Sequence, residues 1–242
     1  MSAETMLKVD GLNAWYGAAH ILYDLGFEVG RGEVVALMGR NGAGKSTTLK
    51  AIMGLIGKRG SVQFNGRDIS RAKPHEIARL GLGYTPEDRR IFVDLTVAEN
   101  LDIGRQPPRS FADGQPAPVW TPERLYKLFP NLAEMTERPG GRMSGGEQQM
   151  LTVARTLMGN PLLVLLDEPS EGVAPLIVEQ MADTIVELKK EGLSILLSEQ
   201  NMHFSRLVSD RAYVLEKGQI RWQGSMAALE RDIDVQRAYL TV

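Results

Sequence analysis

The sequence contains no cysteine among its 242 residues. Disulfide bridges, thiolate zinc sites and thiol nucleophiles are therefore excluded, which fits a reducing compartment. The sequence also lacks a continuous apolar run of the roughly 18–20 residues needed to cross a bilayer, so we expect any membrane role to come through a partner. The stretch MSAETMLKVD at the N-terminus has no basic region followed by an apolar one, and we expect no secretory signal.

The sequence has no excess of positive charge either. The 28 lysines and arginines are matched by 30 aspartates and glutamates, which gives a formal net charge of −2 and a pI near 6.0. This balance argues against a broad basic face, and we expect no nucleic-acid partner. What is present, 43% hydrophobic and 24% charged residues, is typical of a globular chain with one large α/β domain or two small ones.

Two kinds of apolar pattern predict two kinds of sheet. Alternating residues at 6–10, 25–29 and 61–64 are typical of half-buried strands, which we expect to pair as an antiparallel sheet near the N-terminus. Continuous apolar runs occupy 34–38, 162–166 and 193–197. Each precedes a polar turn and then a helical pattern, as expected for the central strands of a parallel sheet covered on both faces.

The section between the first two of these runs is predicted to be helical. Thr96 and Glu99 have capping-box spacing, and Thr121-Pro122-Glu123 is typical of a helix start. Residues 105–120 hold four of the twelve prolines, so we expect a surface excursion there. The chain is therefore predicted to be one compact α/β domain with an inserted helical lobe.

The stretch GRNGAGKST, residues 39–47, follows the apolar run 34–38 and precedes a helical pattern. It satisfies G-x-x-x-x-G-K-[ST] in the strand–loop–helix context that a phosphate loop requires. Glycines let the backbone wrap a phosphate at a helix N-terminus, Lys45 supplies a positive charge to the β and γ phosphates, and Ser46 is placed to bind Mg²⁺. The predicted binding residues are Gly39, Arg40, Asn41, Gly42, Ala43, Gly44, Lys45, Ser46 and Thr47.

Two acids, Asp167 and Glu168, end the apolar run 162–166. Open α/β sheets bind ligands at the carboxyl ends of their strands, so we expect both acids near the phosphate loop. Asp167 is suited to hold Mg²⁺ through water, and Glu168 is the candidate base that orients or deprotonates an attacking water. A strand that simply ends in solvated acids is the alternative, which the phosphate loop in the same sheet makes the weaker one.

The stretch MSGGEQQMLTVARTLMGNP, residues 143–161, permits two interpretations. Ser144 and Glu147 have capping-box spacing, so the stretch could be only a well-capped core helix. That interpretation leaves Gly145-Gly146 unexplained, because glycine in a first helical turn costs roughly 1 kcal/mol relative to alanine. Free N–H groups at a helix N-terminus also bind phosphate, so Ser144, Gly145, Gly146 and Glu147 form a second candidate phosphate receptor, expected to serve a neighbouring subunit.

The order GRNGAGKST, SGGEQ, LLVLLDEP resembles the nucleotide-binding subunit of an ATP-binding cassette (ABC) transporter over nearly the whole chain. The resemblance implies an ATPase that binds ATP and Mg²⁺, with Lys45 and Glu168 taking part in hydrolysis. It implies one nucleotide-binding domain over 1–242, with a P-loop NTPase (RecA-like) core and β subdomain at 1–88 and 160–242 and a helical signature subdomain at 89–159. Tyr16 matches the aromatic that stacks on adenine, although an ordinary strand-end tyrosine is the alternative.

The resemblance also implies partners. In this family two ATPase subunits dimerise head to tail, so that each ATP lies between one phosphate loop and the signature motif of the other subunit. We expect a homodimer or heterodimer bound to two membrane permease subunits, with a periplasmic or extracellular solute-binding protein acting indirectly. The chain would then lie at the cytoplasmic face of the inner membrane, held there by the permeases.

Three positions depart from the family pattern. Glu87 stands where most relatives have a glutamine that contacts magnesium, and its carboxylate remains an oxygen ligand. Ala174 replaces an aspartate in the loop after the acidic pair. Gln200 occupies the place of the switch histidine; its amide can donate a hydrogen bond to the γ phosphate but cannot take a proton, which leaves Glu168 as the candidate base. His203 lies three residues further on, and its spacing argues against a role.

Together PEDRRIF, SEGVAP and SEQN resemble the LivF-type ATPase of high-affinity branched-chain amino acid importers. ATPases of importers for urea, short amides or aromatic compounds are close alternatives. A non-transport ABC ATPase acting on nucleic acid or the ribosome fits less well, because the chain has neither a coiled-coil insertion nor a second cassette. A nucleotide kinase would lack SGGEQ. Beside Gln200, Glu199 is predicted to be a supporting polar neighbour.

Overall fold

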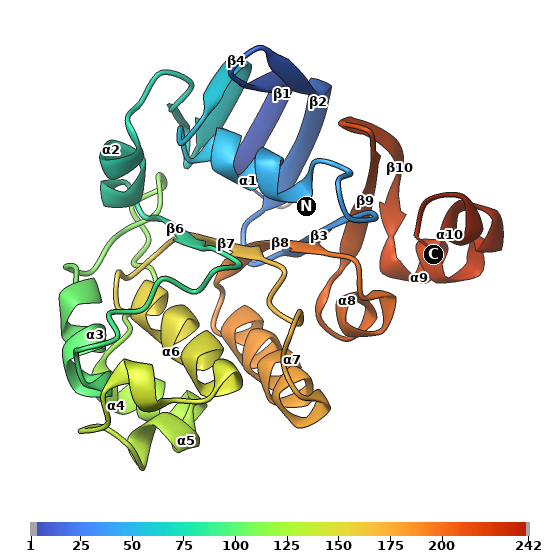
Figure 1. The fold of residues 1–242 in the computed structure, drawn as a ribbon. Coiled ribbons are helices and arrows are strands. Elements are labelled where there is room, and N and C mark those ends of the chain that lie inside the picture. Colours follow the sequence, from blue (N-terminus) through green and yellow to red (C-terminus); the bar gives the residue numbers. More distant parts are fainter. Residues whose placement is uncertain (1–3, 241–242) are drawn as a thin grey trace.

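The computed structural model describes residues 4–240. Figure 1 shows an antiparallel sheet at the top, a central sheet seen edge-on across the middle and a layer of helices below it. Helix α1 (Lys45–Ile52) lies between the two sheets, and the C-terminal helices lie beside the central sheet. The phosphate loop therefore enters the space between the sheets.

The antiparallel sheet is longer-stranded than its sequence pattern predicts. Its order is β2-β1-β4-β5. The strands are β1 (Thr5–Tyr16), β2 (Ala19–Gly30), β4 (Gly57–Phe64) and β5 (Arg67–Asp68). Register shifts interrupt the pairing of β1 and β2, one of them between Val9 and Leu12, so the apolar alternation changes phase although the strand continues. These irregularities explain why the alternation marks only parts of β1 and β2.

The central sheet confirms the predicted α/β fold. Its order is β10-β9-β3-β8-β7-β6, and every neighbouring pair is parallel except β9 with β10. The three continuous apolar runs become β3, β7 and β8, which are buried along their whole length. The strands are β3 (Val34–Met38), β6 (Leu82–Thr85), β7 (Leu163–Asp167), β8 (Ser194–Glu199), β9 (Arg211–Glu216) and β10 (Gln219–Ser225).

Alternate residues of β3 enter two different cores. Val35 and Leu37 join the apolar cluster that packs against α1 and the antiparallel sheet, whereas Ala36 and Met38 join the cluster on the helical side. A strand buried on both faces needs apolar residues at every position, which is why its sequence is continuous rather than alternating. Both cores thus hold the central strands in place, and with them the loops at their carboxyl ends.

The helices begin where their caps predict. Thr96 and Ser144 each form a complete capping box, with Glu99 and Glu147 respectively. No helix within residues 4–240 combines the length and apolar character needed to span a membrane. The helices are α2 (Pro74–Arg79), α3 (Val97–Gly104), α4 (Pro122–Leu128), α5 (Pro130–Ala133), the short 3₁₀ helix η1 (Gly140–Arg142), α6 (Gly145–Leu157), α7 (Pro175–Lys190), α8 (Met202–Val208), α9 (Met226–Arg231) and α10 (Ile233–Tyr239).

Residues 105–120 are irregular, as the prolines predict, but they are not a free surface excursion. Phe111 and Trp120 are buried. Arg109 donates from its guanidinium to the carbonyl oxygens of Arg79, Gly159 and Asn160, at 2.7, 3.2 and 3.0 Å. These carbonyls precede β6 and β7, so the segment is tied to the amino ends of the central strands, opposite the edge that carries the phosphate loop.

Candidate active site

The stretch 39–47 connects β3 to α1, as its sequence predicts. Gly44 is the N-cap of α1 and has a left-handed backbone, with φ of 110°. A Cβ atom at Gly44 would lie 2.8 Å from Leu22 Cδ2, so both conformation and space require glycine there. Lys45 folds back over the loop and donates to the carbonyl oxygens of Gly39 and Arg40 at 2.9 and 3.2 Å. The loop is thereby closed around its own lysine.

A cavity of about 450 Å³ opens beside this loop, a size suited to a small-molecule ligand. The structure brings half of the candidate ligand-binding and catalytic residues to its wall. Two further residues line it, the apolar Ile21 and the acidic Glu171. The candidate residues in the wall are Tyr16, Asn41, Gly42, Gly44, Lys45, Ser46, Thr47, Glu87 and Glu168.

Other candidates do not reach the cavity wall. Gly39 and Ala43 are buried at the base of the loop, and Arg40 is exposed beside it. Asp167 is buried at the end of β7, one residue before Glu168. Gln200 directly follows β8 and is half-buried outside the wall, and the signature residues Ser144, Gly145, Gly146 and Glu147 begin a different element, α6.

Glu168 forms a buried ion pair with Lys45. Glu168 Oε1 lies 3.0 Å from Lys45 Nζ, and the two side chains are only 6% and 3% exposed. Glu168 has a left-handed backbone, with φ of 47°, a conformation that costs a non-glycine residue about 1–3 kcal/mol and clusters at functional sites. Its N–H is held by the hydroxyl and the carbonyl of Ser198 on β8, both at 3.1 Å. The neighbouring strand thus fixes the strained residue.

A second acid, Glu171, lies beside Glu168 and was not identified from the sequence. The pKa of Glu171 is raised to about 7, first by a hydrogen bond to Glu168 and then by burial and by repulsion from Glu168. The backbone explains the proximity, because the Glu171 N–H donates to the carbonyl of Glu168 at 3.1 Å and closes a turn. The spacing Glu168…Glu171 across that turn is the sequence signal that could have found it.

Asp167 is held from two sides. Ser198 donates from its hydroxyl to Asp167 Oδ1 at 2.7 Å, and Tyr84 on β6 donates from its hydroxyl to Oδ2 at 3.1 Å. Burial, followed by the charge of Asp167, raises the pKa of Tyr84 well above its usual range, so its hydroxyl stays protonated as a donor. Neither partner was identified from the sequence, because both contacts join distant segments.

The buried charges at this edge of the sheet suit a divalent cation. Asp167 and Glu168 are almost fully buried, and among their partners only Lys45, which pairs with Glu168, carries a positive charge. Glu168 Oε2 is buried and makes no hydrogen bond within residues 4–240. Within that range no three acidic, histidine or cysteine side chains form a metal site by themselves. That arrangement suits Mg²⁺, which commonly takes one or two carboxylates together with substrate phosphates.

The signature helix α6 has the capping box that its sequence predicts. The Glu147 N–H donates to Ser144 Oγ at 3.3 Å, and the Ser144 N–H donates to Glu147 Oε2 at 2.6 Å. The two glycines also have a packing role that we did not predict. A Cβ at Gly146 would lie 2.7 Å from Ile177 of α7, and one at Gly145 would lie 2.9 Å from the guanidinium of Arg89. Packing inside the chain therefore accounts for part of the glycine requirement.

The family model described as "ABC transporter" matches residues 22–171, more than half of the chain. The chain belongs to the ABC transporter family. It is therefore an ABC ATPase, as the order of its motifs predicts. ATP is its substrate, and the cavity beside the phosphate loop is the candidate place for it.

The chain is similar to the ATP-binding proteins of two known transport systems. The chain is 42% identical to the "high-affinity branched-chain amino acid transport ATP-binding protein BraG" of Pseudomonas aeruginosa, over 97% of this chain and 99% of that one. It is 34% identical to the "lipopolysaccharide export system ATP-binding protein LptB" of Haemophilus influenzae, over 98% of this chain and 97% of that one. The first likeness agrees with the resemblance to branched-chain amino acid transport ATPases.

A solved structure shares the fold. The chain superposes on the ADP conformation of the ATP-binding cassette MJ1267 with a TM-score of 0.79 and 26% identity, covering 97% of both chains. The antiparallel sheet, the mostly parallel central sheet and the helices of Figure 1 therefore form an ABC ATPase cassette.

Proposed function

We propose that this ABC ATPase powers an importer of branched-chain amino acids. The observation that carries the proposal is the likeness to BraG along nearly the full length of both chains, at higher identity than the likeness to LptB. The departures at Glu87, Ala174 and Gln200 support it, because they occur together in the LivF-type subgroup that the sequence resembles.

The site geometry supports a hydrolytic mechanism. When ATP enters the cavity, its phosphates compete for Lys45. The lysine then moves away from the loop carbonyls and from Glu168 and binds the β and γ phosphates. The released carboxylate of Glu168 then accepts a proton from the attacking water. Gln200 donates its amide hydrogen to a γ phosphate oxygen. Mg²⁺, held by Ser46, Asp167 and Glu87, would neutralise part of the phosphate charge.

The signature residues support a head-to-tail dimer. Ser144 to Glu147 lie outside the cavity that holds this chain's own phosphate loop. We propose that they bind the ATP held on the phosphate loop of a second ABC ATPase subunit, in a homodimer or a heterodimer. Closure around two ATP molecules would drive the permeases through alternating access, and hydrolysis would reopen the dimer.

A groove of about 530 Å³ is the candidate docking surface for the permeases. Part of its wall comes from residues 1–88 and 160–242, including Leu55 and Pro161, and part from residues 89–159, including Phe92 and Ile103. Leu55, Phe92 and Ile103 are about half exposed, at 47%, 47% and 53%. We propose that the groove divides the core from the helical subdomain and receives a cytoplasmic segment of each permease, which would hold the ATPase at the inner membrane.

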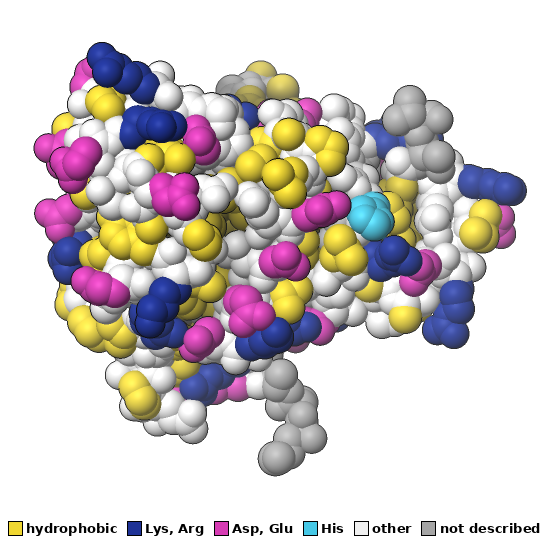
Figure 2. All heavy atoms as spheres, turned by 90° about the horizontal axis from the view of Figure 1, so that it is seen from below, with side chains coloured by type: hydrophobic (Ala, Val, Ile, Leu, Met, Phe, Trp, Pro, Cys, Tyr) yellow, Lys and Arg dark blue, Asp and Glu magenta, His cyan; other side chains and the backbone are white. Residues whose placement is uncertain are grey.

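Other transport functions remain as alternatives, with separate support. The likeness to LptB favours an export ATPase as the second candidate. Importers for urea, short amides or aromatic compounds would use the same ATPase chemistry, since no residue of this chain is expected to touch the solute. On the face seen in Figure 2, acidic and basic side chains are interspersed, which supports a non-nucleic-acid role.

Reconstitution tests the proposal. The chain would be co-expressed with the permease and ATPase genes adjacent to its own and purified as a complex in lipid nanodiscs. We expect the adjacent solute-binding protein, loaded with leucine, to raise the ATPase rate severalfold above that with empty binding protein. Stimulation by urea or an aromatic compound alone would reassign the solute. Failure to co-purify with any permease would argue against transport.

A further inference from the structure

Glu199, the last residue of β8, carries a carboxylate in an unusual environment. It is 1% exposed and forms no ion pair within residues 4–240. Three backbone N–H groups donate to it, and the Ser170 side chain also hydrogen-bonds to it. Ser170 donates to Oε1 at 3.0 Å, and Gln200 and Asn201 both donate to Oε2 at 3.1 Å.

A buried carboxylate without a cation is costly for the fold. Burial raises the pKa of Glu199, and the hydrogen bonds from Ser170 and Asn201 oppose that shift. Removing an ionised group from water costs several kcal/mol that backbone donors recover only in part. An apolar residue would fill the same space without burying a charge, so core packing alone does not account for a glutamate there.

The carboxylate joins two segments, one beside the proposed base Glu168 and one at the proposed phosphate donor Gln200. Its Oε1 holds the backbone of Ser170, two residues after Glu168, and its Oε2 holds the backbone of Gln200. The preceding residue on β8, Ser198, holds the N–H of Glu168 and a carboxylate oxygen of Asp167. At the end of β8, Ser198 therefore holds Asp167 and Glu168, and Glu199 holds Ser170 in the turn that follows them.

We propose that Glu199 is a positioning residue for ATP hydrolysis, which holds the backbone of Gln200 in register with the segment Glu168–Ser170. The inference rests on the proposed roles of Glu168 and Gln200. A carboxylate suits this task because both oxygens accept hydrogen bonds, so one side chain can bridge donors on two segments. A glutamine offers one acceptor oxygen, and its NH₂ group would oppose the N–H groups on the other side.

The test compares Glu199→Gln with Ser194→Ala. Ser194 lies at the opposite end of β8, where its hydroxyl accepts from the Gly32 N–H at 2.9 Å, so its loss removes a buried hydrogen bond far from the site. Both variants should lower Tm. We expect Glu199→Gln to lower kcat by about 10- to 100-fold while the KM for ATP and the Kd for a nonhydrolysable ATP analogue stay within about twofold. Ser194→Ala should keep the wild-type kcat.

A folded Glu199→Gln protein with kcat within twofold of wild type would overturn the inference. Glu199→Asp keeps the charge but is one methylene too short to bridge, so it should also lose kcat. If neither variant folds, amide hydrogen exchange of the wild-type chain decides: the Ser170, Gln200 and Asn201 amides should be equally protected, and rapid exchange at Ser170 would refute the bridge. Glu168→Gln, measured in parallel, tests the proposed base separately from the proposed role of Glu199. Hydrolysis near the wild-type rate in that variant would contradict Glu168 as the base, irrespective of the result for the Glu199 variants.

Discussion

Lys45 Nζ lies 3.0 Å from Glu168 Oε1 in the interior of the candidate active site, where the proposed phosphate-binding cation and the proposed base neutralise each other. A buried ion pair of this kind contributes little net stability, but removing one partner leaves an uncompensated charge. The pair therefore keeps both groups in place until a nucleotide supplies a stronger partner for the lysine. Its energetic coupling can be measured without any nucleotide.

We expect Lys45→Met to lower the free energy of unfolding by about 3–5 kcal/mol, because Glu168 then stays buried without its cation. The double variant Lys45→Met/Glu168→Gln should recover most of that loss, since it buries no charge from either residue. Urea unfolding of the four proteins of this double-mutant cycle, in nucleotide-free buffer, measures the coupling. Additive effects of the two substitutions would show that the pair has no energetic role.

Glu168→Gln should separate ATP binding from hydrolysis. The amide keeps the size of the side chain but cannot accept the proton of the attacking water, so we expect turnover to fall at least about 100-fold. ATP affinity should remain close to wild type, and ATP should trap the closed dimer. Steady-state hydrolysis, nucleotide titration and size-exclusion chromatography with ATP measure the three quantities. A rate near that of wild type would mean that another group is the base.

Gln200 gives a third prediction, because its amide is expected to donate to the γ phosphate. Gln200→Ala removes that donor and should slow hydrolysis about tenfold, whereas Gln200→His restores a donor and should be tolerated. His203→Ala is the matched control, since His203 is exposed on α8 and has no predicted role. Initial rates at saturating ATP provide the comparison. If neither change at Gln200 alters the rate, Gln200 is only a loop residue after β8 and takes no part in hydrolysis.

Sequence reasoning predicts the features that depend on neighbouring residues. The loop 39–47, the strands β3, β7 and β8 and the capping boxes at Thr96 and Ser144 all follow from short patterns, and the structure has each of them. The length of β1 could not be predicted, because register shifts break its alternation.

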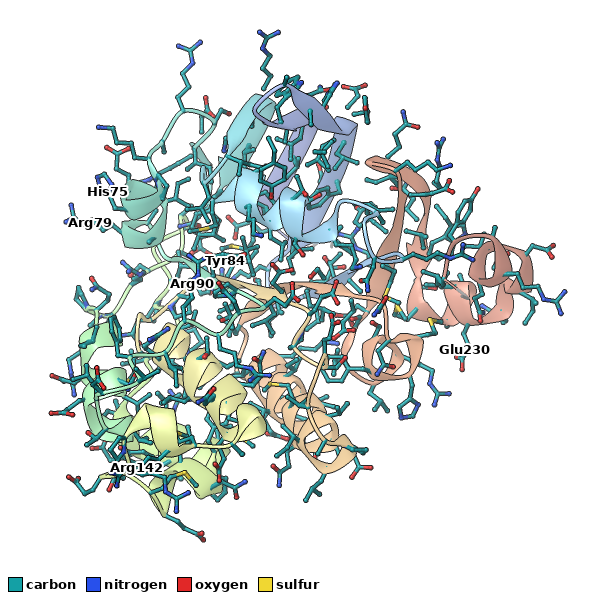
Figure 3. All side chains as sticks on the ribbon, viewed as in Figure 1. His75, Arg79, Tyr84, Arg90, Arg142 and Glu230 are labelled. Carbon is teal, nitrogen blue, oxygen red and sulfur yellow. The ribbon has the colours of Figure 1, made fainter. Side chains whose placement is uncertain are left out.

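Contacts between distant segments could not be predicted either. Tyr84 is 83 residues from Asp167 and Ser198 is 31 residues away, so no local pattern links these donors to their acceptor. In Figure 3, Tyr84 lies at the edge strand β6, with Arg90 just beyond it. Only the pairing of β6 with β7 brings that hydroxyl to the acidic pair. The supporting contacts of the site are therefore set by sheet order rather than by sequence spacing.

Ala174 leaves α7 without a side-chain cap. It occupies the N-cap position in an extended conformation, before Pro175 in the first turn. Ala174→Asp or Ala174→Ser should stabilise the fold by about 0.5–2 kcal/mol, because their side-chain oxygens add an acceptor for the first-turn N–H groups, of which that of Ile177 bonds to the Ala174 carbonyl at 2.8 Å. Thermal unfolding measures the gain, and Ala174→Val, which offers no acceptor, is the control. Equal Tm values for the serine and valine variants would contradict capping as the reason.

The lowered pKa of Lys58 predicts how the free energy of unfolding changes with pH. Burial lowers its pKa to about 8, and its ammonium donates to the carbonyl of Ile52 at 3.2 Å. An unfolded lysine titrates near 10.4, so between about pH 8 and 10.4 the unfolded chain binds more protons than the folded chain, and the contribution of Lys58 to stability rises with pH. Below pH 8 the half-buried charge imposes its full penalty, which solvent screening keeps below about 3 kcal/mol.

Lys58→Met removes that penalty. We expect the variant to be more stable than wild type at pH 7, by at most about 3 kcal/mol, and the difference to shrink as the pH rises toward 10.4. Denaturant unfolding at several pH values measures the trend. Lys190→Met, on the exposed surface of α7, controls for the loss of one positive charge. A difference for Lys58→Met that stays constant from pH 7 to 10 would mean that Lys58 remains charged in the folded chain over that range.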